Sequence, residues 1–237
     1  MRAPRAILFD WDNTLVDSWA TIHEALNFLM RAMDKPEWSL AETHQRVRLS
    51  LRESFPQIFG ERWEEARDIY LDRFRAIHLE RLTALPGREA MLRSLAGWGI
   101  FLGVVSNKTG ALLRREVEQL GWSGFFGSVV GAGDAAADKP ACDPVHFALT
   151  RSGIAAGEDV WLVGDTEIDM QCALNSGCVA VLLANSATPD EFDRFAPRLS
   201  FTDGVSLFRS LEGLRFGAAS PSSKAGSVES SPGVSGL

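Results

Sequence analysis

The sequence has few residues of the kinds that build disulfide frameworks, zinc sites or nucleic-acid surfaces. Among its 237 residues are 3 cysteines and 4 histidines, and neither set has a metal-binding spacing. An odd, sparse set of cysteines gives no disulfide framework and fits a reducing compartment, so we expect a cytoplasmic protein. Basic residues are outnumbered, 24 against 31 acidic ones, for a net charge of −7. This balance argues against a nucleic-acid partner, because phosphate backbones require basic surfaces.

Long apolar runs are also absent. No stretch is long enough for a membrane span, and the N-terminal segment runs too soon into a short apolar strand to be a signal peptide. We therefore expect no membrane association. A small anionic substrate is still compatible with the negative charge, because a local site can be positive on an acidic protein. The length suits one core domain with a smaller insertion, as a monomer or a small homo-oligomer.

Short apolar runs alternate with helical patterns along most of the chain. Residues 6–9, 100–105, 160–163 and 179–183 are runs of the buried-strand type, and residues 129–130 form a weaker one. Apolar strands that alternate with helices indicate a parallel sheet that is covered on both faces. We therefore predict an α/β fold: a Rossmann-like open parallel sheet with helices on both faces.

One stretch breaks this alternation. Residues 17–84 show only helical periodicity, and three helices in a row exceed a normal crossover between strands. We predict that residues 17–84 form an inserted all-helical cap domain, although they could instead simply cover the sheet. The catalytic core would then comprise residues 1–16 and 85–217. Residues 218–237 are mostly Gly, Ser, Ala and Pro, a composition that predicts a disordered tail.

Asp10 and Asp12 follow the first predicted strand directly. Two carboxylates two residues apart at a strand end converge on one site once the chain turns, and their charges repel unless a cation or a proton intervenes. Oxygen ligands with that charge favour Mg²⁺. A solvated acidic turn, or a helix cap at Asp12, explains the same residues, and this motif alone does not decide between the two.

Three more polar groups follow later strands. Asp165 and Asp169 come after one apolar run, where an N-cap with acids in the first helical turn is the simpler explanation. Ser106 and Asn107 end another strand, where a hydroxyl, an amide and the N–H groups of a helix start suit a phosphoryl group, although a plain turn is commoner. Lys139 lies in a loop after the weaker strand and is followed by proline.

Together the four motifs resemble the haloacid dehalogenase-like (HAD) hydrolase superfamily, and within it the phosphoglycolate phosphatase-like group with a helical cap. The resemblance covers about residues 5–183, and the order, spacing and strand-end placement of the motifs agree with it. The opening motif of the family is usually Asp-x-Asp-Gly-Thr, and the one departure here is Asn13 in place of glycine. Asparagine tolerates left-handed backbone angles, so the turn can be kept.

The resemblance implies a phosphatase that hydrolyses small phosphate monoesters, phosphoglycolate being the family-level expectation. It makes Asp10 the nucleophile that forms an aspartyl phosphate and Asp12 the general acid and base, with Mg²⁺ as the cofactor. The implied roles are catalytic for Asp10, Asp12, Ser106 and Lys139; substrate-binding for Thr14, Asn107 and Lys139; and metal-binding for Asp10, Asp12 (through its backbone carbonyl), Asp165 and Asp169.

Two other functions are compatible with some of these motifs. A phosphosugar mutase of the same superfamily also uses Asp12, so the opening motif cannot separate it from a phosphatase. A receiver-like signalling domain, phosphorylated on aspartate, gathers similar residues around Mg²⁺, but it is much shorter and has no helical insertion. Cap residues carry no general code for the substrate, and the sequence leaves open whether Arg46, Arg48 or Arg52 contacts it.

Overall fold

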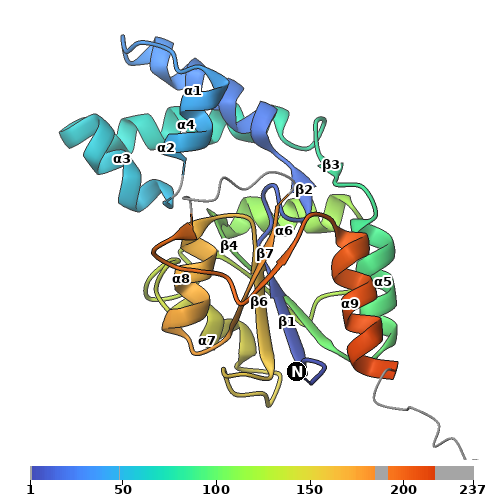
Figure 1. Cartoon of the computed structure of the whole chain (residues 1–237). Coiled ribbons are helices and arrows are strands. Elements are labelled where there is room, and N and C mark those ends of the chain that lie inside the picture. The colour runs from blue at the N-terminus through green and yellow to red at the C-terminus, as the bar shows by residue number, and fades with distance from the viewer. Residues whose placement is uncertain (1, 48, 185–191, 217–237) are drawn as a thin grey trace, which may run out of the picture.

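A six-stranded parallel sheet forms the centre of the molecule (Figure 1). The computed structural model describes residues 2–47, 49–184 and 192–216. The strands of the sheet are β1 (Ala6–Phe9), β4 (Phe101–Thr109), β5 (Ser128–Ala132), β6 (Val160–Gly164), β7 (Val179–Leu183) and β8 (Leu199–Phe201). Their spatial order is β5–β4–β1–β6–β7–β8, which is the strand order of a Rossmann fold. The predicted open parallel sheet is therefore confirmed, with β8 as a strand that the sequence patterns did not indicate.

Helices cover both faces of this sheet. Alternate residues of β1 point to opposite faces, so that Ile7 and Phe9 join one hydrophobic cluster and Ala6 and Leu8 join the other. The first cluster is completed by α5 (Arg88–Gly97), α6 (Gly110–Gln119) and α9 (Gly204–Phe216), and the second by α7 (Asp143–Leu149) and α8 (Glu167–Asn175). Burial on both faces explains why the strands read as continuous apolar runs.

A helical group, α1 to α4, lies above the carboxyl ends of the strands (Figure 1). It consists of α1 (Trp19–Ala32), α2 (Leu40–Arg46), α3 (Leu51–Phe59) and α4 (Trp63–Ile77), with the 3₁₀ turn η1 (Gly60–Arg62) before α4. The group has a hydrophobic cluster of its own, which Leu112 of α6 joins from below. Two short antiparallel strands, β2 (Val16–Asp17) and β3 (Thr83–Ala84), carry the chain out of the sheet and back. The predicted tail, residues 218–237, lies outside the described residues.

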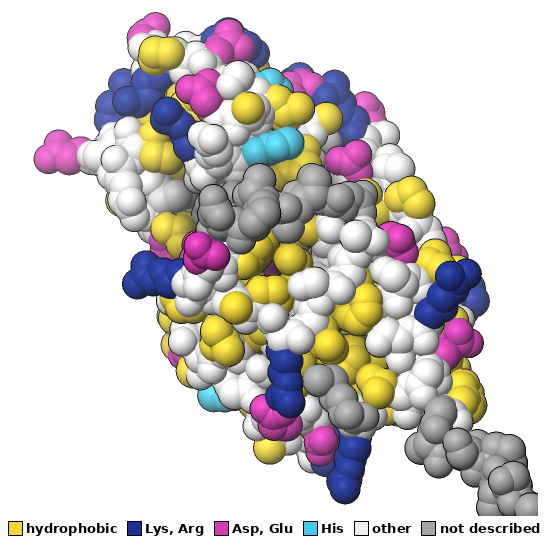
Figure 2. Space-filling view, in the orientation of Figure 1, with side chains coloured by type: hydrophobic (Ala, Val, Ile, Leu, Met, Phe, Trp, Pro, Cys, Tyr) yellow, Lys and Arg dark blue, Asp and Glu magenta, His cyan; other side chains and the backbone are white. Residues whose placement is uncertain are grey.

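One face of the molecule shows mixed charge (Figure 2). On the described part of the face in Figure 2, Lys and Arg side chains lie scattered among Asp and Glu, without a large basic patch. Within the described ranges, no helix combines the length and the apolar character that crossing a bilayer requires.

Candidate active site

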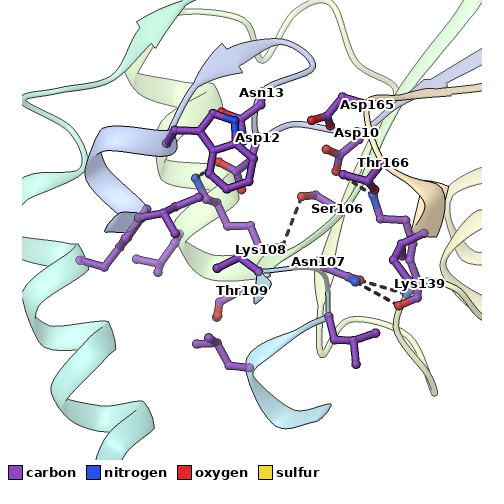
Figure 3. A pocket seen from close by; sticks show the side chains of 18 of the residues that line it. Asp10, Asp12, Asn13, Ser106, Asn107, Lys108, Thr109, Lys139, Asp165 and Thr166 are labelled. Atoms are coloured by element: carbon purple, nitrogen blue, oxygen red, sulfur yellow. Dashed lines mark hydrogen bonds and ion pairs between the residues drawn. The ribbon is translucent and has the colours of Figure 1, made fainter. Parts of the chain in front are cut away.

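Side chains from four strand ends meet in one cavity beneath the helical group (Figure 3). Asp10 follows β1, Ser106 lies near the end of β4, Asp165 follows β6, and Lys139 comes from the loop after β5. All of them line a cavity of about 120 Å³. Parallel strands end at the same edge of a sheet, and β1 is where the strand order reverses, the usual position of a ligand site in open α/β folds.

A buried lysine holds two of the acidic side chains. Lys139 Nζ donates to Asp10 Oδ1 at 2.7 Å and to Asp169 Oδ1 at 2.6 Å. Burial raises the pKa of Asp10 to about 6. The positive charge of Lys139 opposes this rise, and repulsion from Asp169 adds to it. Burial also opposes the charge on Lys139, but the two carboxylates together outweigh it and raise the lysine pKa. Lys139 therefore stays a cation directly against Asp10.

Three carboxylates are gathered closely enough to hold one metal ion. Asp10, Asp165 and Asp169 each offer an oxygen within 4.8 Å of the others. Burial, followed by repulsion from the other two carboxylates, raises the pKa of Asp165 well above its usual value. A divalent cation that prefers oxygen ligands would remove this repulsion, so the donor set fits such an ion. The side chain of Asp12 is outside this group.

The start of α8 fixes Asp169. Its Oδ2 accepts from the backbone N of Thr166 at 3.0 Å and from the Thr166 hydroxyl at 2.7 Å, while its Oδ1 faces Lys139. The N-cap explanation drawn from the sequence therefore accounts for Oδ2 of Asp169, but not for Oδ1, which contacts Lys139. Gly164 makes room for this side chain, because a Cβ there would lie 2.2 Å from Asp169 Cγ.

Asn107 positions the lysine backbone. Its Oδ1 accepts from Lys139 N and its Nδ2 donates to Lys139 O, both at 3.0 Å (Figure 3). The register between β4 and β5 shifts between Val105 and Thr109, an irregularity of the kind that redirects side chains at a strand end. Both polar ends of the Asn107 side chain are therefore engaged with Lys139, although the residue lines the cavity.

The turn after β1 is held by Asn13 and Thr14. Asn13 has a φ of 63°, so the expected left-handed conformation is confirmed. Thr14 is fully buried, and its hydroxyl donates to Asp165 Oδ1 at 3.0 Å. Thr14 does not line the cavity, so the structure places it behind Asp165 rather than in contact with a ligand there.

A second buried network surrounds Asp12. Lys108 Nζ donates to Asp12 Oδ1 at 2.7 Å and to Glu116 Oε2 at 2.6 Å. Glu116 also accepts from Trp11 Nε1 at 2.6 Å and contacts His78 Nδ1 at 2.7 Å. Burial opposes the charge on Glu116, but Lys108 and these hydrogen bonds keep its pKa below the usual range. Lys108 thus fixes the carboxylate of Asp12, a contact that the sequence analysis missed.

Arg52 links the helical group to the loop that carries Lys139. Its Nε and Nη2 donate to the two carboxylate oxygens of Asp138 at 2.5 and 2.6 Å, and the Asp138 side chain is only 2% exposed. Arg52 is not among the residues that line the cavity, and neither is Arg46, which is exposed. Arg48, the third arginine considered, lies outside the described residues.

Comparison with known proteins gives matches over most of the chain. Residues 7–183 match a family model described as haloacid dehalogenase-like hydrolase. A phosphoglycolate phosphatase of Xanthomonas campestris pv. campestris is 32% identical over 185 residues, which are 76% of this chain and 83% of that protein. One from Aquifex aeolicus is 29% identical over 78% of this chain and 90% of that protein. A haloacid dehalogenase-like hydrolase structure from Streptococcus pneumoniae shares the fold, with a TM-score of 0.78 at 22% identity, over 89% of this chain and 99% of that one.

Proposed function

We propose that this chain, which belongs to the haloacid dehalogenase-like hydrolases, is a Mg²⁺-dependent phosphatase that forms an aspartyl phosphate on Asp10. It is a hydrolase of phosphate monoesters, as the names of its relatives indicate. The observation that carries the mechanism is the 2.7 Å contact of Lys139 with Asp10, which also belongs to an acidic triad suited to a metal ion. Phosphoglycolate is the first ester to test, because the relatives are named for it.

The proposed reaction has two steps. The Asp10 carboxylate attacks phosphorus, the bond from phosphorus to the ester oxygen breaks, and Asp12 gives that oxygen its proton. Water then attacks the phosphorus of the aspartyl phosphate, Asp12 accepts the proton of the water, and inorganic phosphate leaves Asp10. Lys139 and Ser106 face the phosphoryl oxygens. Phosphoryl transfer requires mainly positioning and charge neutralisation, which these residues supply.

The metal would be held by Asp10, Asp165 and Asp169, with the backbone carbonyl of Asp12 as a further ligand. When bound, Mg²⁺ neutralises charge on the phosphoryl oxygens. The residues present fit this ion, because burial and mutual repulsion raise the pKa of two of the three carboxylates in its absence. Lys108 supports the arrangement by holding the Asp12 side chain away from the triad.

The helical group is proposed to act as the cap, residues 17–84, over this core. It lies above the carboxyl ends of the strands (Figure 1), and eight of its described residues line the cavity. Closure of such an element excludes water and selects the substrate. A phosphosugar mutase, the other enzyme considered, would need polar partners for sugar hydroxyls, and the described cap residues that line the cavity are mostly apolar.

The direct test of this function is phosphate release from a panel of phosphate monoesters, with Mg²⁺ and with a chelator. We expect hydrolysis of at least one small ester and of an activated aryl phosphate, both lost on chelation. Undiminished turnover in the chelator would contradict the metal requirement. Conversion of a hexose phosphate into its isomer without phosphate release would indicate the mutase instead.

Replacing Asp165 by asparagine should separate metal binding from folding. The pKa of Asp165 is raised in the metal-free protein, so its contribution to stability is present below the unfolded pKa and is lost as the pH rises through the folded pKa. Near neutral pH the metal-free variant should therefore melt at a higher temperature than the wild type. Binding of Mg²⁺ should raise the melting temperature of the wild type but have little effect on the variant.

The control is Asp68→Asn, since that side chain is 64% exposed on the helical group. It should keep the wild-type response to Mg²⁺. An Asp165→Asn variant that melts below the wild type in chelator, or that keeps the full Mg²⁺ response, would contradict the proposed metal site.

Arg52→Ala should weaken substrate binding more than it slows the chemistry. The substitution removes both hydrogen bonds between the helical group and Asp138, the neighbour of Lys139. Charge-assisted hydrogen bonds are worth about 1.5–3 kcal/mol, and exposure of Arg52 reduces this, so we expect a rise in KM of roughly tenfold with a smaller change in kcat. Steady-state kinetics measures both. Arg62→Ala, which removes an exposed ion pair of the same group, is the matched control and should leave KM unchanged; an equal effect in both variants would contradict the link.

A further inference from the structure

The part of the cavity wall that the helical group supplies is mainly apolar. Among the described residues, the helical group contributes eight to the lining. Of these eight, only Trp19 and Tyr70 carry a polar atom in the side chain. Leu112 of α6 extends the same wall from the core side. The eight are Trp19, Ile22, Val47, Leu49, Leu51, Tyr70, Leu71 and Phe74. A leaving group that extends from a phosphoryl group at Asp10 toward the helices would therefore meet mainly hydrocarbon.

The cations in the described lining are already paired. Lys139 contacts Asp10 and Asp169, and Lys108 contacts Asp12 and Glu116, at 2.6 to 2.7 Å. Each lysine thus faces two carboxylates, so neither of these two described cations is free to pair with an anionic leaving group. Burying an uncompensated carboxylate against an apolar wall is costly. The charge pattern therefore disfavours a second anionic group on the substrate.

We propose that the preferred substrate is a phosphate monoester of a short, uncharged, apolar alcohol. This inference rests on the proposed phosphatase reaction and concerns only the leaving group. The reaction is the hydrolysis described above: the bond from phosphorus to the ester oxygen breaks, water supplies the new oxygen on phosphorus, and the alcohol leaves with a proton. The apolar part of the alcohol packs against the wall of the helical group, which transfers its hydrocarbon surface out of water.

The cavity is partly open to solvent, and its volume favours a small alcohol. Its volume is about 120 Å³, and an apolar protein cavity of ~150 Å³ admits a benzene molecule. Because the phosphoryl group takes part of this space, the remainder suits a short alkyl chain or a small branched one. A sugar would place several hydroxyl groups against side chains that offer few hydrogen bonds.

The test is kcat/KM for the Mg²⁺-loaded enzyme with methyl, ethyl, propyl and butyl phosphate, compared with phosphoglycolate and glycerol phosphate. Burying a methylene group favours binding about fourfold, so kcat/KM should rise by about that factor with each added carbon until the cavity is full. Propyl phosphate should exceed phosphoglycolate, which is of similar size, by tenfold or more. A preference for phosphoglycolate or glycerol phosphate would overturn the inference but leave the phosphatase intact. Failure to hydrolyse any ester, an activated aryl phosphate included, would overturn both.

A single added charge in the wall should reduce the preference for the alkyl ester. Leu49 lines the cavity, is half-buried and lies outside the hydrophobic cluster of the helical group. Leu49→Arg should lower kcat/KM for propyl phosphate and raise it for phosphoglycolate, so that their ratio falls at least tenfold. Leu40→Arg, on an exposed residue of α2 away from the cavity, is the control and should leave the ratio unchanged.

Arg48 is tested in the same way, because it adjoins two lining residues but is itself not described. Arg48→Ala should preserve the preference for the alkyl ester. The contrary result has two parts: the wild type prefers phosphoglycolate, and Arg48→Ala selectively loses turnover of that ester. This result would show that Arg48 binds a substrate carboxylate, and it would overturn the inference.

Discussion

Asp10→Asn will abolish turnover of every ester, because an amide cannot attack phosphorus as a carboxylate does. Loss of the nucleophile in a hydrolase with covalent catalysis lowers kcat by about 10⁶-fold, and we expect an effect of that order here. The substitution keeps the size of the side chain and an oxygen for Lys139, whose Nζ lies 2.7 Å from Asp10 Oδ1. Phosphate release measured over hours, with wild-type contamination controlled, gives the residual rate.

The stability of this variant distinguishes a catalytic defect from misfolding. Burial raises the pKa of Asp10 from 3.8 to about 6, so ionisation of this group costs stability as the pH rises through that range. The metal-free Asp10→Asn variant should therefore melt no lower than the wild type at neutral pH. Asp72→Asn, on a side chain that is 77% exposed, is the control and should keep full activity. Residual turnover of Asp10→Asn within a hundredfold of the wild type would contradict the role of Asp10.

Asp12→Asn will have an effect that depends on the leaving group. General acid–base catalysis contributes ~10² to 10⁴-fold, and an alkoxide leaving group needs the proton, so turnover of alkyl phosphates should fall by that factor. An activated aryl phosphate needs no proton on its leaving group and should still transfer its phosphoryl group to Asp10. The asparagine keeps an oxygen for Lys108, so the buried network around Glu116 should survive.

The second step then becomes limiting in this variant. Hydrolysis of the aspartyl phosphate needs a base to accept the proton of water, and Asp12→Asn removes it. With an aryl phosphate we therefore expect a rapid burst of about one phenol per enzyme, followed by slow turnover. Equal losses for alkyl and aryl esters, without a burst, would contradict the acid–base role of Asp12.

The parts of the fold and site that depend on local pattern could be predicted from the sequence. β1, β6 and β7 are buried on both faces, so they are unbroken apolar runs, and Asp10 and Asp165 could be placed at the ends of two of them. β8 was missed because its three residues are only partly buried or exposed at the edge of the sheet. A short edge strand carries little apolar signal.

Contacts between distant segments could not be predicted. Arg52 and Asp138 lie 86 residues apart, and nothing near either residue in the sequence indicates the pair. Glu116 did carry a signal, since it shares the buried face of α6 with Leu113 and Val117. A charged residue on an apolar helical face is rarely buried without a partner. That partner is Lys108, directly after the Ser106-Asn107 motif.

The most direct test of the mechanism is rapid-quench mass spectrometry of Asp12→Asn after mixing with an activated aryl phosphate and Mg²⁺. We predict a phosphorylated peptide that contains Asp10, with nearly one phosphate per enzyme at the end of the burst and none in the double variant with Asp10→Asn. Because asparagine has nearly the size of aspartate and keeps one side-chain oxygen, the comparison isolates the loss of each carboxylate. Phosphate on another residue, or undiminished turnover of alkyl phosphates without any phosphorylated peptide, would contradict an aspartyl phosphate on Asp10.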